Sequence, residues 1–357
     1  MNDPVAQDFR DQLILVVGGA GFVGSNLVHM LLTHEPRQII VVDNLLSSEP
    51  INIPDDDRVR FVFGSITDDQ ILAAIPTDVD FVFHLACYHG NQSSIANPLA
   101  DHANNTLTTL KLFERLKDFT QLKKVVYSAA ACAVAEKTYD QPTATTEDQS
   151  VSLYHDSPYS ISKLIGELYS NYYFQRHRLS VVKARFSNVY GPREILGAGQ
   201  WRGTVHTVWR NVIPTFIWRA LKGEALPLDN GGIASRDFIY VEDMARGLIA
   251  CALRGVAGEV YNLATGQQTT ILELATMINE RTGNRKPVQL GPERNWDRSG
   301  KRFASTRKAE AELGFKASVD IREGLRRTIE WTTANKQLIA VTIARHRKQL
   351  GQVGERC

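Results

Sequence analysis

The feature that most constrains this chain is a glycine-rich turn near its start. An apolar run over 13–17 precedes the turn and predicts a buried strand, and an apolar helical pattern over 27–32 follows it. Between the two lie glycines spaced by three residues: Gly18, Gly21 and Gly24. Such glycines permit a tight turn, a close approach to a pyrophosphate, and close packing of helix on strand. The first N–H groups of the helix then face the phosphates, with the positive end of the helix dipole behind them.

Apolar runs alternate with helical patterns through the first half of the chain. Strands are predicted at 13–17, 38–42, 59–63, 79–85, 124–127 and 179–184. This alternation predicts an α/β fold with a Rossmann-type, doubly wound parallel sheet. Farther on, glycine-marked loops and shorter elements indicate a smaller, discontinuous α/β lobe. We expect a sheet domain over 1–188 with returns around 229–264, a lobe over 189–228 and 265–332, and a basic C-terminal tail over 333–357 that packs as a helix or frays.

Composition excludes several kinds of partner. A net formal charge of +2 argues against a nucleic acid or a membrane surface. No apolar run approaches the roughly 20 residues that span a bilayer. The cysteines have no CxxC spacing and no histidine cluster beside them: Cys87, Cys132, Cys251 and Cys357. We therefore expect no metal site, no disulfide framework and a reducing, cytoplasmic location.

Asp43 ends the second predicted strand, about 20 residues after the glycines. An acidic side chain at this place accepts hydrogen bonds from both ribose hydroxyls of adenosine. It also repels a 2′-phosphate. The sequence therefore predicts NAD rather than NADP as the dinucleotide.

Tyr159 and Lys163 stand four residues apart on a long helix predicted to start at Ser157-Pro158, so they share one face. A tyrosine hydroxyl ordinarily titrates near about 10. A cationic lysine and an oxidised nicotinamide beside it favour the phenolate. Such a phenolate can take the proton of an alcohol that is being oxidised.

These residues occur together with other motifs of the chain. The set comprises Gly18 to Gly24, Asp43-Asn44, His84-Leu85-Ala86, Asn104-Asn105, Tyr159 with Lys163, and Arg185 to Pro192. In combination they resemble the extended short-chain dehydrogenase/reductase family, over roughly 12–334. Within it the chain is similar to nucleotide-sugar epimerases, dehydratases and UDP-glucuronate decarboxylases. Those enzymes recycle NAD, and their shared first step oxidises the sugar at C4 to a ketone.

The resemblance implies where the ligands bind. For the cofactor it implies Gly18, Gly21, Phe22, Val23, Gly24, Asp43, Asn44, Ser65, Ile66, Leu85, Ala86, Asn104, Tyr159 and Lys163. For a nucleotide-diphosphate sugar it implies Tyr88, Ser93, Asn188, Arg202, Asn211, Val212, Arg236 and Arg298. Arg236 and Arg298 are expected on the pyrophosphate, because a planar guanidinium grips phosphate oxygens with two hydrogen bonds. The resemblance also implies a homodimer through helices over 100–117 and 158–176.

The chain departs from the family at the end of the fifth strand. Most members carry Ser or Thr where this chain has Ala130, and that hydroxyl binds the substrate beside the tyrosine. Candidates to replace it are Ser128, Tyr88, Ser93 or a water. The acidic pair of the 4,6-dehydratases is replaced by Ala131 and Cys132, which counts against dehydration. A glutamate expected of the decarboxylases at Cys132 is also missing.

Cys132 follows three alanines in a segment similar to that of GDP-mannose 3,5-epimerase, where the cysteine moves protons at sugar carbons. A 4-ketone acidifies the hydrogens on C3 and C5, and a thiol with a pKa of about 8.5 can exchange them. That family pairs the cysteine with a lysine, and this chain has Arg202 there. Arg202 is a poorer acid, but it can stabilise an enolate or bind a carboxylate. The alternative interpretation is that Cys132 is only a small buried residue among alanines.

The sequence therefore predicts an NAD-dependent nucleotide-sugar epimerase with Tyr159 as base, Lys163 as its tuning group, and Cys132 and Ser128 as further catalytic candidates. It leaves open 4-epimerisation or epimerisation at C3 or C5. The alternatives are a UDP-glucuronate decarboxylase and, in another class, a non-catalytic relative that binds NAD and a nucleotide.

Overall fold

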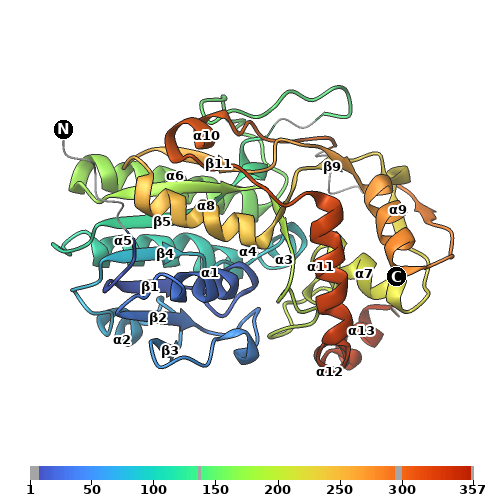
Figure 1. The fold of residues 1–357 in the computed structure, drawn as a ribbon, viewed down its shortest axis with the longest axis horizontal. Coiled ribbons are helices and arrows are strands. Elements are labelled where there is room, and N and C mark those ends of the chain that lie inside the picture. The colour runs from blue at the N-terminus through green and yellow to red at the C-terminus, as the bar shows by residue number, and fades with distance from the viewer. Residues whose placement is uncertain (1–7, 136–137, 294–299, 355–357) are drawn as a thin grey trace.

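The computed structural model describes residues 8–135, 138–293 and 300–354. Within these residues a seven-stranded parallel sheet runs in the order β11-β6-β5-β4-β1-β2-β3 (Figure 1). Its strands are β1 (Leu13–Val17), β2 (Gln38–Asp43), β3 (Val59–Phe63), β4 (Phe81–His84), β5 (Lys124–Ala130), β6 (Val181–Phe186) and β11 (Val260–Leu263). The chain builds outward from β1 on both sides, so the strand order reverses between β1 and β4. This is the Rossmann-type, doubly wound sheet that the sequence predicts, and such a reversal opens a ligand crevice at the carboxyl ends of the strands.

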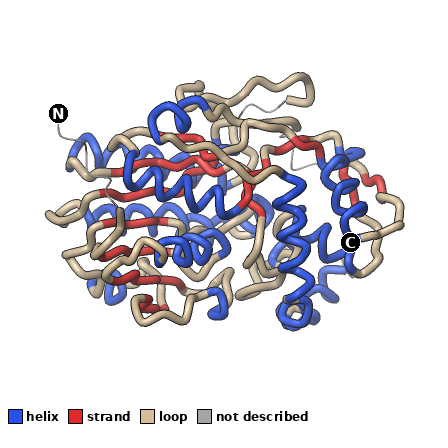
Figure 2. The backbone as a smooth tube through the Cα atoms, in the orientation of Figure 1, coloured by secondary structure: helices blue, strands red, loops and turns tan. Residues whose placement is uncertain are grey.

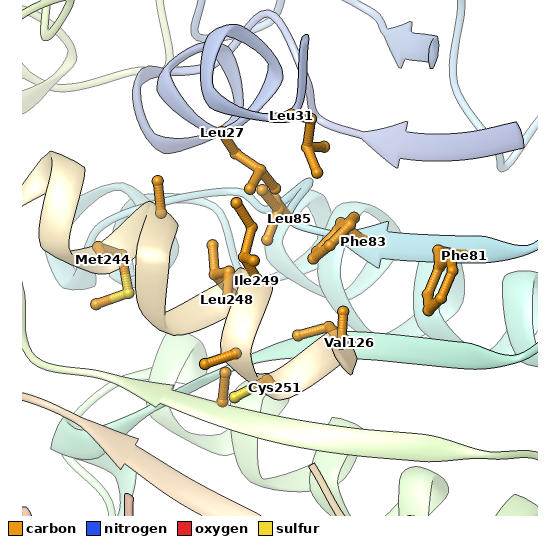
Figure 3. Packing of buried hydrophobic residues seen from close by; sticks show 14 of the residues in the cluster. Leu27, Leu31, Phe81, Phe83, Leu85, Val126, Met244, Leu248, Ile249 and Cys251 are labelled. Carbon is orange, nitrogen blue, oxygen red and sulfur yellow. The ribbon is translucent and has the colours of Figure 1, made fainter. Parts of the chain in front are cut away.

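Helices cover both faces of the sheet. The first face carries α1 (Phe22–Leu32) and α8 (Val241–Arg254), and the second carries α2 (Asp69–Ala73), α5 (Thr108–Leu116) and α6 (Pro158–His177). Successive residues of β1 alternate between the two apolar clusters, as pleated strands require: Ile14 and Val16 join the first cluster, and Leu15 joins the second. Figure 3 shows Leu27 of α1 and Leu248 of α8 packed over the sheet.

Local sequence sets where α6 begins and ends. Ser157 precedes the helix, and its hydroxyl accepts a hydrogen bond from the N–H of Ser160. Pro158 occupies the first turn, where its missing N–H costs nothing. Arg178 ends the helix in the left-handed conformation, with φ of 59°. Between these limits α6 holds Tyr159 and Lys163 on one rigid element.

A second lobe is built from shorter elements, seen on the opposite side of the molecule from β1 to β3 in Figure 1. Its helices α7 (Val212–Leu221), α9 (Ile271–Thr282) and α11 (Ile321–Ala334) enclose a separate apolar cluster. The short strand pairs are β13 (Gln289–Gly291) with β8 (Pro227–Asp229), β12 (Thr269–Thr270) with β9 (Ser235–Arg236), and β10 (Phe238–Tyr240) with β7 (Asn188–Tyr190).

The remaining elements lie beside or between these two parts. They are α3 (Asn91–Ala96), α4 (Pro98–Asp101), the π-helical segment His102–Leu107, α10 (Arg307–Leu313), and the 3₁₀ turns Pro50–Asn52, Ala131–Ala133, Val205–Thr207 and Asn230–Gly232. Figure 2 shows that loops join most of the lobe to the sheet. None of the helices in the described part of the chain is long and apolar enough to cross a membrane.

The basic tail packs as two helices rather than fraying. They are α12 (Lys336–Arg345) and α13 (Arg347–Gly354). Thr342 donates a hydrogen bond to the carbonyl of Leu196 at 2.7 Å, and Nε2 of His346 donates to the carbonyl of Gly197 at 2.9 Å. The tail therefore holds the loop that follows β7.

Candidate active site

A cleft of about 690 Å³ lies between the carboxyl ends of the sheet strands and the second lobe. The sheet side of its wall comes from the segments that follow β1, β2, β4, β5 and β6. The lobe side comes from the loop after β7 and the start of α7. The cleft includes the place where the strand order reverses, which is where open α/β sheets bind ligands.

The glycine turn forms one end of this cleft. Gly18 has a φ of +85°, and a Cβ there would lie 2.5 Å from the backbone nitrogen of Ala86. A Cβ on Gly24 would overlap the carbonyl oxygen of Gly18. Gly21 precedes α1, and no side chain of the described residues caps that helix. The backbone of 22–24 lines the cleft with N–H groups left for an anionic ligand.

Asp43, the last residue of β2, also lines the cleft. Its carboxylate accepts hydrogen bonds from the N–H of Ala20 at 3.0 Å, the N–H of Leu45 at 2.8 Å and the hydroxyl of Ser48 at 3.0 Å. Burial raises the pKa of Asp43, and these hydrogen bonds oppose the rise. Other predicted cofactor residues that line the cleft are Asn44, Ser65, Ile66, Leu85, Ala86 and Asn104. A tight glycine cradle, uncapped N–H groups and a fixed carboxylate together fit NAD.

Tyr159 and Lys163 reach the cleft from α6. The ammonium of Lys163 lies 5.9 Å from the centre of the Tyr159 ring and donates to the carbonyl of Ser128 at 2.8 Å and to its hydroxyl at 3.3 Å. Ser128 is therefore held by the lysine. Burial raises the pKa of Tyr159 well above its usual value, and the nearby thiols of Cys87 and Cys132 add to the rise. A cation beside Tyr159 opposes this rise, because it favours the anionic form of the tyrosine.

Two thiols lie beside this tyrosine. Cys132 sits in the 3₁₀ turn that follows β5, is partly exposed, and lines the cleft. Cys87 follows β4, is also partly exposed, and lines the cleft too. The wall around Cys132 is otherwise methyl groups, with Ala130 at the end of β5. Cys132 therefore lines the cleft instead of being buried in the core. The sequence reasoning gave no role to Cys87.

The lobe side of the cleft holds a line of polar side chains. Nε2 of His89 lies 3.3 Å from Oδ1 of Asn211, and Nδ2 of Asn211 donates to Oε1 of Glu194. The His89 ring meets the Tyr159 ring edge to face, with their centres 5.8 Å apart. Burial, opposed by Asn211 and by the charge of Arg210, raises the pKa of Glu194 to about 7. Asn211 was predicted from sequence, but His89 and Glu194 were not.

Tyr88 and Arg202 do not take the places predicted for them. Both are buried, and neither lines the cleft. The Arg202 guanidinium lies over the Tyr88 ring at 5.5 Å and donates to the carbonyl of His89 at 2.9 Å. Arg202 therefore supports the loop that carries His89 instead of facing a sugar, so it is not the cleft partner of Cys132. The spacing of residues in the sequence does not indicate that Arg202 packs against the Tyr88 ring and the carbonyl of His89.

The other predicted substrate residues mostly line the cleft. These are Ser93, Asn188, Val212 and Arg236. Arg236 is nearly buried and donates to the carbonyls of Ser235 at 2.8 Å and Gly300 at 2.5 Å. Arg298 lies outside the described residues.

Asn105 is a supporting residue that the sequence reasoning noticed only as part of a motif. Its Oδ1 accepts a hydrogen bond from the N–H of Tyr88 at 2.7 Å, and its Nδ2 donates to the hydroxyl of Ser162 at 3.1 Å. It thereby joins the loop after β4 to α6. The neighbouring Asn104 lines the cleft. Asn105 therefore supports the site, and Asn104 forms part of its wall.

The sheet, the glycine turn and the tyrosine–lysine pair define an NAD-binding enzyme of the Rossmann type. Residues 14–264 match the model of the NAD dependent epimerase/dehydratase family, and the chain belongs to that family. Its cofactor is NAD.

Relatives with this fold bind nucleotides. The chain is 58% identical to the Bordetella bronchiseptica enzyme WbmF, whose crystal structure holds NAD⁺ and UDP; the match covers 96% of this chain and 98% of that one, with a TM-score of 0.87. It is 30% identical to UDP-glucose 4-epimerase of Thermotoga maritima with UDP-glucose, over 91% and 99%, with a TM-score of 0.81. It is also 30% identical to dTDP-glucose 4,6-dehydratase of Streptomyces antibioticus, over 90% of this chain and 93% of that protein.

Proposed function

We propose that this chain is a nucleotide-sugar epimerase that works through a transient 4-keto sugar. The ligands of similar proteins, UDP in WbmF and UDP-glucose in the Thermotoga enzyme, support a nucleotide-diphosphate sugar as substrate. Tyr159, as its phenolate, takes the proton of the C4 hydroxyl, and the cation of Lys163 favours that phenolate before the transfer. When bound, NAD accepts and returns the hydride at C4.

The observation that favours epimerisation at C3 or C5 is the partly exposed thiol of Cys132, which lies near enough to Tyr159 to affect its pKa. Next to a 4-ketone, the C–H bonds at C3 and C5 become acidic. The thiolate takes one of these protons, and the electron pair of the C–H bond moves into the enolate oxygen. A water on the opposite face then donates a proton to that carbon, the electron pair returns from the enolate oxygen to restore the ketone, and the carbon is inverted. The hydroxide left by the water takes the proton from the Cys132 thiol. Ketone reduction then releases the epimer.

The test is NMR in heavy water with the purified protein, NAD and, in turn, UDP-glucuronate, UDP-glucose and GDP-mannose. We expect deuterium at C3 or C5 of one sugar. Cys132→Ala should slow this exchange by about 10²- to 10⁴-fold, the usual contribution of a general acid–base group. Cys87→Ala is the matched control, because it removes a second thiol from the same cleft.

Other outcomes would contradict this proposal in recognisable ways. A 4-epimer without deuterium would indicate hydride transfer alone and would leave Cys132 without a catalytic role. A pentose product would indicate a UDP-glucuronate decarboxylase. No product and no NADH from any of the three sugars would favour the non-catalytic alternative.

We also propose a homodimer through α6 and the helices beside it. Ile161, Leu168 and Tyr172 are spaced by seven and four residues, so they form one stripe on α6, and Leu168 and Tyr172 are 59% and 53% exposed. Leu99 and Leu107 add exposed apolar surface from the helical segments near α5. Sedimentation equilibrium should give twice the chain mass, and Leu168→Glu should shift the protein to monomer. A monomeric wild type would contradict the dimer.

A further inference from the structure

Three polar side chains from separate segments form a continuous line along the lobe side of the cleft. His89 comes from the loop after β4, Glu194 from the loop after β7, and Asn211 from the residue before α7. Glu194 is only 7% exposed, and its Oε2 has no hydrogen-bond partner among the described residues. The line ends at the His89 ring, which contacts Tyr159.

The line has a definite polarity when Glu194 is ionised. A carboxylate only accepts hydrogen bonds, so Asn211 must turn its NH₂ group toward Glu194. The carbonyl oxygen of Asn211 then faces Nε2 of His89, and a carbonyl only accepts. His89 must therefore carry its proton on Nε2. Its other ring nitrogen, Nδ1, is left with a lone pair and can only accept.

We propose that Glu194, acting through Asn211, fixes His89 in the Nε2–H tautomer, so that Nδ1 accepts a hydrogen bond from a hydroxyl or amide N–H of the sugar beside the carbon that Tyr159 serves. This inference rests on the proposed function, because the donor it describes belongs to a nucleotide sugar. His89 would then supply the sugar with a polar contact that the alanines at the end of β5 do not provide. Glu194, which acts through Asn211, is a positioning residue.

The surrounding charges keep the His89 ring neutral. Burial lowers the pKa of His89 to about 4; the cations of Arg202, Arg210 and Lys163 lower it further, and the hydrogen bond with Asn211 opposes them. The ring is therefore neutral near neutral pH, and its hydrogen-bond partner decides which nitrogen carries the proton. The backbone carbonyl of His89 is held by Arg202, so the ring is positioned from both sides.

The charged group beside Glu194 is Arg210, which is itself held by backbone carbonyls. It donates to Ser47 at 2.6 Å, to Thr207 at 3.1 Å and to Ala198. Burial lowers the pKa of Arg210 to about 9. The pKa of Glu194, about 7, means that its carboxylate predominates above this pH, where the polarity argument applies fully.

The experiment is a long-range ¹H–¹⁵N correlation spectrum of the ligand-free full chain with labelled histidine, recorded at pH 8.5. The chain has nine histidines, and His89→Gln identifies the signal of His89 by its loss. We expect Nε2 to be protonated and the ratio of the two tautomers to exceed about tenfold, which corresponds to one hydrogen bond of about 1.4 kcal/mol. Glu194→Gln and Asn211→Leu should lower this ratio toward that of a free neutral imidazole, because an amide at 194 either donates or accepts and a leucine does neither.

Glu49→Gln is the matched control. Glu49 accepts from the N–H of Gly199, close in sequence to Glu194, but no hydrogen bond joins it to Asn211 within the described residues. It should leave the His89 tautomer unchanged. A wild-type His89 protonated on Nδ1, or an unchanged tautomer ratio in both Glu194→Gln and Asn211→Leu, would overturn the inference.

A second readout concerns the sugar. For the nucleotide sugar that the wild type converts, Glu194→Gln should lower kcat/KM about tenfold, mainly through KM, while the affinity for free UDP stays within about twofold. An equal loss of UDP affinity would contradict a sugar-specific role. The tautomer spectrum needs no substrate, so it tests the inference about His89 independently. If the protein converts none of the nucleotide sugars, that result counts against the proposed function alone.

Discussion

The two ends of the cleft are built on different principles. At the cofactor end, the backbone of one short segment, fixed by Gly18 and Gly24, lines the cleft together with the side chain of Asp43. At the lobe end, the cleft is lined by side chains brought together from distant segments, with Glu194 buried and its pKa raised to about 7. The glycine turn depends on the absence of side chains, whereas the lobe end depends on buried polar ones.

This difference determines how each end responds to pH. Backbone N–H groups do not titrate, so the glycine turn keeps its anion-binding character across the physiological range. A buried carboxyl does titrate, and its proton is linked to the stability of the whole chain. Asp43 at the cofactor end and Glu194 at the lobe end are both such carboxyls, so the pH dependence should come from these side chains and not from the glycine turn.

The largest effect we expect concerns Glu194. Its pKa is about 7 in the fold, against a reference of 4.5, so its stabilising contribution is full below about pH 4.5 and is lost as pH rises to about 7. At about 1.4 kcal/mol per pKa unit, the loss is about 3 kcal/mol. Glu194→Gln should remove this decline, so the free energy of unfolding in urea should favour the variant increasingly from pH 4.5 to pH 8.

Glu49→Gln serves as the control of opposite sign. Burial alone would raise the pKa of Glu49, but hydrogen bonds from Arg345 and from the N–H of Gly199 outweigh it and lower the pKa. Its contribution is therefore present at neutral pH and lost as the solution becomes acidic. If the two variants changed the pH profile in the same direction, the contrast between the two carboxyls would be wrong.

The fold was largely predictable, because its signals are local. The apolar runs at 13–17 and 59–63 match β1 and β3, and the long helix predicted to start at Ser157-Pro158 matches α6. The helix after the glycine turn starts at Phe22 and contains the apolar pattern over 27–32. Its first turn contains Gly24, a poor helix former, and close packing against Gly18 outweighs that propensity.

The candidate site was less evenly predictable. The predicted cofactor residues line the cleft, because one strand–turn–helix motif places many of them. Arg202 was expected to face a sugar and is instead buried against Tyr88 and the carbonyl of His89. Arginine is seldom buried, so its sequence context gives no sign of this. The line from His89 to Glu194 spans three separate segments, and only the folded chain brings them together.

A smaller effect is expected from Gly18→Ala, which should change ligand binding at the cofactor end of the cleft but not at the lobe end. Gly18→Ala introduces a Cβ at φ of +85°, only 2.5 Å from the backbone of Ala86, so the turn must shift. At a strain of about 2 kcal/mol, the affinity for NAD should fall about 30-fold, whereas the affinity for UDP should hardly change. Calorimetric titration with each ligand measures both. Gly223→Ala is the matched control, because its φ is +68° and nothing lies within 4 Å of the added Cβ. Equal losses of NAD and UDP affinity in Gly18→Ala would mean that a change at the cofactor end also alters binding at the lobe end. The two ends would then not be independent.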